Sequence, residues 1–164
     1  MAFNEQSIEE KIRNWLSKAK RAVVAGVGNP LRRDDFVGVE VVKGLGNKVS
    51  QNVYLIQCET VPESFIQPII DFKPSHILVI DAGLLDSPIG SFKLVEPKEI
   101  VAIPPVSTHA LPLRILCEYL TKTTNAKIAL LIIQPKETDF GEGLSAELQK
   151  TAKYLTNLLS KSLP

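Results

Sequence analysis

Runs of consecutive apolar residues alternate along the chain with segments in which apolar residues recur every three or four positions. The runs predict buried strands, and one alternating segment predicts an edge strand; in order they are 22–28, 53–56, 77–80, 90–95 and 128–133. The helical spacing predicts helices at 7–21, 37–45, 62–70, 112–120 and 145–160. Strands that alternate with helices form βαβ units. We therefore expect an α/β fold, a three-layer αβα sandwich with a mostly parallel central sheet of about five strands and one antiparallel edge strand.

The chain has 164 residues, a length typical of one domain. We expect a single domain over 1–164, made of an α/β core over 22–159 and an N-terminal helical extension over 1–21. Ser7, followed by Glu10 three residues later, predicts the start of the extension's helix through a capping box. We expect this helix to pack against the core, and contact with a partner protein is the alternative.

The charge is nearly balanced, with 19 Lys and Arg against 18 Asp and Glu. A balanced charge gives no reason to expect nucleic acid as a partner. No apolar run approaches the ~20 residues of a membrane span, and the N-terminal segment lacks the apolar core of a signal peptide. We therefore expect a cytoplasmic protein. Two cysteines, Cys58 and Cys117, and two histidines are too few for a disulfide scaffold or a zinc module, so free buried thiols are expected.

Candidate chemistry lies where strands end, because ligands of parallel α/β sheets bind at the carboxyl ends of the strands. After the first strand the chain reads GVGNPLRRDDFVG. The match to a dinucleotide fingerprint fails, since its third glycine would fall at Leu31. Asp34 and Asp35 would repel a phosphate and attract a cation. One of them can cap the following helix, which leaves the other available for function.

Two further residues are expected at the same edge of the sheet. Asp81 ends the third strand, and His109 lies in a loop that enters a helix. Alone, Asp81 could form an Asx turn and His109 could bind backbone groups. Together with Asp35 they make a plausible facial set for a divalent metal, held loosely because the set has no thiolate and only one imidazole. His76 begins a strand at the opposite edge and is expected to be structural.

Other mechanisms lack their signatures. The chain has no G-x-S-x-G nucleophile elbow, no H-E-x-x-H zinc peptidase motif and no C-x-x-C redox motif. A carboxylate site with one imidazole therefore remains.

In these motifs the chain resembles the hydrogenase maturation endopeptidases, from about Ala22 to Leu159. The resemblance rests on motifs in a specific order: Gly26–Leu31 with Asp34 and Asp35, Val79–Ala82, and Thr108–His109. The run Ser107–Leu113, with Gln134 and Pro135, is similar to the formate-hydrogenlyase subgroup. The resemblance implies the αβα fold already expected and an aspartyl-type endopeptidase activity.

The resemblance also implies a substrate and a metal. Enzymes of this family remove a C-terminal extension from the large-subunit precursor of nickel–iron hydrogenases after nickel insertion. The family's metal-binding residues map onto Asp35, Asp81 and His109, which would serve as catalytic and metal-binding residues here. The metal would be nickel, supplied by the substrate and bound transiently. A metal-bound water and a carboxylate acting as general base are both reasonable ways to hydrolyse the peptide bond.

Two departures from the family pattern affect the site. Phe36 stands where the family usually has glycine and would line the approach to Asp35. The segment after the second strand, which the family links to substrate selection, reads Gln57–Thr60 here, so Cys58, Glu59 and Thr60 are the candidate selection loop. A non-catalytic chaperone that binds nickel or the precursor is the alternative function. A nucleotide-binding domain is a third reading, based on Gly26–Gly28 alone.

Overall fold

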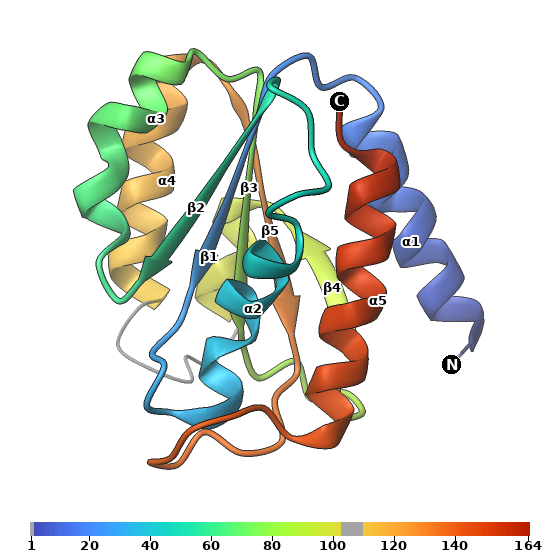
Figure 1. Cartoon of the computed structure of the whole chain (residues 1–164). Helices are drawn as coiled ribbons and strands as arrows, with labels where there is room; N and C mark the ends of the chain where they lie inside the picture. Colours follow the sequence, from blue (N-terminus) through green and yellow to red (C-terminus); the bar gives the residue numbers. More distant parts are fainter. Residues whose placement is uncertain (1, 103–109) are drawn as a thin grey trace.

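The computed structural model describes residues 2–102 and 110–164, with side chains described from Ile8 to Ile100 and from Leu113 to Pro164. A five-stranded sheet forms its centre (Figure 1). The strands are β1 (Ala22–Val27), β2 (Val53–Glu59), β3 (His76–Ala82), β4 (Phe92–Val95) and β5 (Lys127–Ile133). Their order is β2-β1-β3-β5-β4, and each pairing is parallel except that of β4 with β5. The predicted sheet with one antiparallel edge strand is confirmed.

Helices cover both faces of this sheet. They are α1 (Ala2–Leu16), α2 (Val37–Gly44), α3 (Ile66–Phe72), α4 (Ala110–Thr124) and α5 (Ala146–Ser162), with the 3₁₀ turns η1 (Arg33–Phe36), η2 (Pro62–Phe65) and η3 (Pro97–Ala102). Figure 1 shows α3 and α4 on one face and α1, α2 and α5 on the other. Successive strand residues alternate between the faces: Val24 and Leu78 pack in one core cluster, and Val23 and Ile77 in the other. The predicted three-layer αβα sandwich is therefore confirmed.

The prediction for the N-terminal helix is wrong at both ends. Helix α1 runs through Ser7, so this residue does not start the helix, and the helix ends at Leu16 rather than near Arg21. A local hydrogen bond and a tertiary contact mark the end of α1. The Ala19 N–H donates to the Leu16 carbonyl, and the Ser75 hydroxyl accepts the N–H groups of Lys20 and Arg21, which directs the chain into β1.

Strand β2 is longer than predicted and includes Cys58 and Glu59. It pairs with β1 as far as Val27, with a register shift after Gly26, so that Cys58 is the extra residue of a β-bulge. Because β2 lies at the edge of the sheet, polar residues near its end do not interrupt it. The prediction from the apolar residues, 53–56, was therefore too short.

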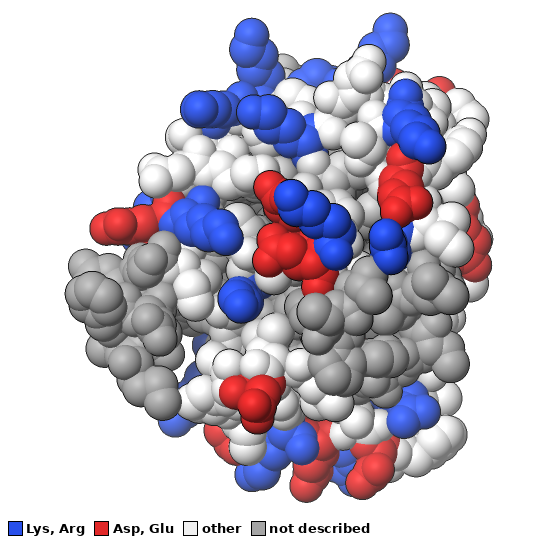
Figure 2. Space-filling view, turned by 180° about the vertical axis from the view of Figure 1, so that it is seen from behind, with Lys and Arg blue, Asp and Glu red and all other residues white. Residues whose placement is uncertain are grey.

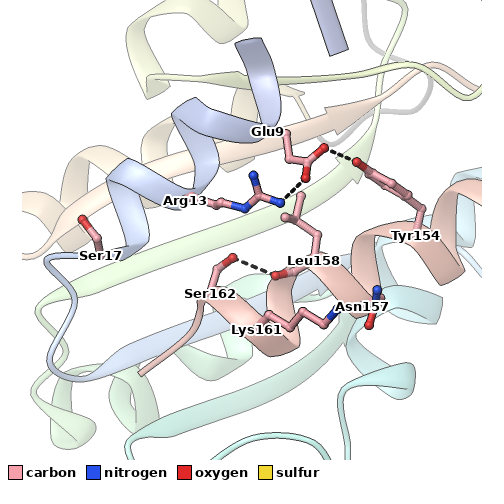
Figure 3. A pocket seen from close by; sticks show the side chains of 8 residues that line it. All are labelled: Glu9, Arg13, Ser17, Tyr154, Asn157, Leu158, Lys161 and Ser162. Atoms are coloured by element: carbon pink, nitrogen blue, oxygen red, sulfur yellow. Dashed lines mark hydrogen bonds and ion pairs between the residues drawn. The ribbon is translucent and has the colours of Figure 1, made fainter. Parts of the chain in front are cut away.

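The first and last helices lie side by side and enclose a pocket (Figure 3). Glu9 on α1 accepts hydrogen bonds from Arg13 and from Tyr154 on α5. The pocket has a volume of about 310 Å³ and is lined by Glu9, Arg13, Ser17, Tyr154, Asn157, Leu158, Lys161 and Ser162. Its α5 residues belong to the second half of that helix. The pocket is therefore far from the carboxyl edge of the sheet, near which α5 begins.

His76 packs at the start of β3, as expected of a structural histidine. Its ring lies 4.9 Å from the Trp15 ring in an edge-to-face contact, and its Nδ1 is 3.0 Å from the Ser75 hydroxyl. Burial, with a smaller effect from Lys127, lowers the pKa of His76. Because Trp15 belongs to α1, its contact with His76 also shows that the N-terminal extension packs against the core.

Charges of both signs are spread over the face seen in Figure 2. Lys and Arg gather toward the top of that view, which is the edge where the parallel strands begin, and Asp and Glu mix with them lower down. In the sequence, Lys18, Lys20 and Arg21 precede β1 and Lys127 begins β5. Among the described helices, none has the length and apolar character needed to cross a membrane.

Candidate active site

The chain between β1 and α2 is pressed against the carboxyl edge of the sheet. Gly28 has a φ of +151°, and a Cβ there would lie 1.9 Å from the Asp35 carbonyl oxygen. A Cβ at Gly38 would lie 2.1 Å from the Ile80 carbonyl oxygen. Both positions need glycine because backbone approaches backbone there. As a result η1, which carries Asp34 and Asp35, sits where β1 and β3 end.

This packing brings Asp35 and Asp81 into one buried site. Asp35 is fully buried; its Oδ2 accepts the Asn29 N–H at 2.9 Å, and its Oδ1 has no hydrogen-bond partner among the described residues. Asp81 is 6% exposed, and its Oδ1 accepts the Ala82 N–H at 2.8 Å. Burial and, next, the Asp35 charge raise the pKa of Asp81 well above its usual range. The two carboxylates are thus close enough to repel each other in an environment that disfavours charge.

We expect Asp81→Asn to stabilise the metal-free protein near neutral pH. The pKa of Asp81 is higher in the folded protein than in the unfolded chain, so protonation of Asp81 stabilises the folded protein. This contribution is fully present below about pH 4 and is lost as the pH rises through the folded-state pKa. Asparagine keeps an acceptor for the Ala82 N–H and carries no charge. Thermal melting with a chelator should show an advantage of the variant that grows as the pH rises from about 4 through the raised folded-state pKa of Asp81.

Asp71→Asn is the matched control, because it makes the same substitution at an exposed aspartate on α3, away from Asp35. If the difference in melting temperature between Asp81→Asn and the unmodified protein does not change with pH, the inferred repulsion between Asp35 and Asp81 is contradicted.

Asp34 has a different role from its neighbour. It is fully buried, and four donors surround its carboxylate: the N–H groups of Lys136, Glu137 and Ser145 and the Ser145 hydroxyl, at 2.8–3.0 Å. It does not cap its own helix, since neither η1 nor α2 has a side-chain cap. Asp34 instead joins the segment before Asp35 to the loop between β5 and α5.

The third predicted site residue, His109, lies outside the described residues, as do Ser107 and Thr108 of its motif. Helix α4 begins at Ala110 and ends shortly before β5 begins, so it starts toward the carboxyl edge of the sheet. Within residues 2–102 and 110–164, no group of three or more His, Cys, Asp and Glu side chains is placed to hold a metal ion. The two carboxylates are the part of the predicted set that the structure brings together.

The predicted selection loop needs a correction. Cys58 and Glu59 belong to β2, and the Cys58 side chain is buried in the core, so it cannot contact a substrate directly. Burial raises the pKa of the Cys58 thiol to about 12 and that of Cys117 likewise to about 12, so neither supplies a thiolate near neutral pH. Glu59 and Thr60 are exposed at the end of the strand. Their part in substrate selection stays a prediction.

Phe36 ends η1 directly after Asp35 and is half-buried. The Lys43 Nζ on α2 lies 4.8 Å from the centroid of its ring, a cation–π contact. The aromatic side chain that replaces the usual glycine is thus engaged by α2. Whether it also lines the approach to Asp35 stays a prediction.

Fold and site together define an α/β protein whose paired, buried carboxylates lie at the carboxyl edge of its sheet. The chain belongs to the hydrogenase maturation protease family, whose model (HycI) matches residues 39–162. It is accordingly a peptidase, as the resemblance in its motifs implied.

Individual relatives agree with this assignment. A protein of Methanocaldococcus jannaschii assigned as a hydrogenase maturation protease is 39% identical over 160 residues, which is 93% of this chain and 94% of the relative. The hydrogenase 3 maturation protease of Escherichia coli K12 is 27% identical over 118 residues, 72% of this chain and 75% of the relative. The crystal structure of the NiFe hydrogenase maturation protease HycI from Thermococcus kodakarensis matches with a TM-score of 0.85 and 33% identity, covering 93% of this chain and 98% of that one.

Proposed function

We propose that this peptidase removes the C-terminal extension from the large-subunit precursor of a nickel–iron hydrogenase after nickel insertion. The observation that carries the proposal is the buried pair Asp35 and Asp81 at the carboxyl edge of the sheet, with one Asp35 oxygen that has no hydrogen-bond partner among the described residues. Family membership supports the reaction class, and the T. kodakarensis relative is a NiFe hydrogenase maturation protease.

The nickel in this proposal belongs to the substrate. A divalent cation would offset the repulsion between Asp35 and Asp81 and would satisfy the unpartnered Oδ1. Carboxylate oxygens and an imidazole are suitable ligands for such an ion, and His109 is the imidazole that the motif implies. The Asn29 and Ala82 N–H groups hold the two carboxylates in place. A set without thiolates binds the ion weakly, which suits an enzyme that tests its substrate for nickel.

The decisive experiment compares precursors with and without nickel. Purified precursor of the hydrogenase large subunit is incubated with the protein, and the mass of the precursor is measured. We expect loss of the C-terminal extension from the nickel-loaded form alone. Equal cleavage of both forms would contradict the proposal that the enzyme tests its substrate for nickel. Absence of cleavage would contradict the proposed removal of the C-terminal extension. Tight binding of the loaded precursor without any loss of mass would instead support the chaperone alternative.

A further inference from the structure

Large apolar side chains are exposed in several loops around the proposed site. They lie after β1, after β2, after β3 and after β5: Leu31, Val61, Leu84, Ile89 and Phe140. Phe140 is 80% exposed and Leu31 is 44% exposed. All four loops follow strands that end at or near the edge where Asp35 and Asp81 lie. Elsewhere, exposed apolar side chains such as Ile115 and Tyr119 lie on helix surfaces.

Leu31 and Phe140 are neighbours although more than a hundred positions separate them. Arg32 and Gly141 form a parallel β-bridge, so the residues before them, Leu31 and Phe140, occupy adjacent positions on the two segments. The Gly141 N–H donates to the Leu31 carbonyl at 2.9 Å, and the Arg33 N–H donates to the Gly141 carbonyl at 3.1 Å. In Figure 1 the loop between β5 and α5 runs beside the segment between β1 and α2. We call Leu31 and Phe140 the apolar pair.

The apolar pair is held in place from both sides. Asp34 accepts N–H groups from Lys136 before Phe140 and from Ser145 after it. A Cβ at Gly141, which has a φ of +153°, would lie 2.7 Å from the Arg33 Nε, so the guanidinium packs directly on this backbone. A solvent-exposed aromatic residue on a backbone held by such contacts is already presented for binding, and aromatic residues often dominate protein interfaces.

The apolar pair is also continuous with the carboxylate site. Leu31 lies between Asn29, whose N–H donates to Asp35, and Asp35 itself. A protein whose tail reaches Asp35 and Asp81 must therefore place its folded body against the loops at this edge. We propose that Leu31 and Phe140 form the docking contact for the body of the protein substrate, which offers an apolar patch beside its C-terminal tail. This inference rests on the proposed function.

The test compares two double variants of the full chain. Leu31→Ser with Phe140→Ser removes the apolar pair, and Ile115→Ser with Tyr119→Ser removes two other exposed apolar side chains, from α4. Cleavage of the nickel-loaded precursor is followed over a range of precursor concentrations. We expect the first variant to raise KM at least tenfold, with kcat within about twofold, because losing two interface anchors weakens binding of substrate and transition state alike. The α4 variant should leave both constants unchanged.

Further measurements separate the possible outcomes. Phe140→Leu keeps an apolar side chain and should retain most of the affinity, and thermal melting should show both double variants to be folded. A normal KM for the Leu31→Ser, Phe140→Ser variant would overturn the docking contact while the proposed function stands. Precursor binding without cleavage, lost in that variant, would support docking and contradict the peptidase reaction. Absence of both binding and cleavage by the unmodified protein would overturn both proposals.

Discussion

Neutralising either buried carboxylate should abolish processing of the precursor. We expect Asp35→Asn and Asp81→Asn each to lower kcat/KM by roughly a thousandfold or more, the scale on which charged catalytic groups act. Asparagine preserves the size of the side chain and an acceptor for the N–H group that each carboxylate binds. The loss would therefore report the missing charge rather than a disturbed fold. The rate of mass loss from the nickel-loaded precursor is the measurement.

Two comparisons make this result specific. Asp71→Asn changes an exposed aspartate on α3 and should cleave at the normal rate. His109→Ala should remove activity as the carboxylate variants do, because the family resemblance gives His109 the third place in the site. If Asp35→Asn or Asp81→Asn keeps a kcat/KM within tenfold of the unmodified protein, that aspartate does not belong to the active site.

Removing the Asp34 carboxylate should have the largest effect on stability. Asp34→Ala removes a fully buried carboxylate and leaves three partly buried backbone N–H groups and the Ser145 hydroxyl without their acceptor. We expect a loss of about 3–5 kcal/mol in the free energy of unfolding, as for removal of one partner from a buried charged network. Guanidinium denaturation followed by circular dichroism measures it. Asp34→Asn should lose less, because its single side-chain oxygen can still accept from part of the set.

The matched control lies in the same loop. Glu137→Ala removes an exposed ion pair with Arg33, in which nitrogen and oxygen are 3.9 Å apart. Such a surface pair contributes about 0–1 kcal/mol, so the variant should unfold almost as the unmodified protein does. Equal stability of Asp34→Ala and Glu137→Ala would show that the Asp34 network does not join the two segments.

The strands that the sequence predicted best are those with apolar neighbours on both faces. Strands β1, β3 and β5 lie inside the sheet, so both sets of their side chains are apolar and appear as unbroken runs. Strand β2 lies at an edge and has exposed residues near its end, and its length was underestimated. The predicted end of α1 was wrong because the distant Ser75 hydroxyl, which no local pattern reveals, accepts the N–H groups of Lys20 and Arg21 and directs the chain into β1.

The sequence by itself determined the succession of strands and helices along the chain. It also placed Asp35 in the segment after the first strand and Asp81 at the end of the third, because apolar periodicity is a local property. Tertiary structure alone decided that Asp34 is an anchor while Asp35 keeps an unpartnered oxygen. It alone placed Leu31 beside Phe140 and made Cys58 the extra residue of a β-bulge in β2. The physical reason is that these roles depend on hydrogen-bond donors and neighbours from distant segments; those that bind Asp34 lie 102–111 positions away. Local patterns in a sequence do not contain such contacts.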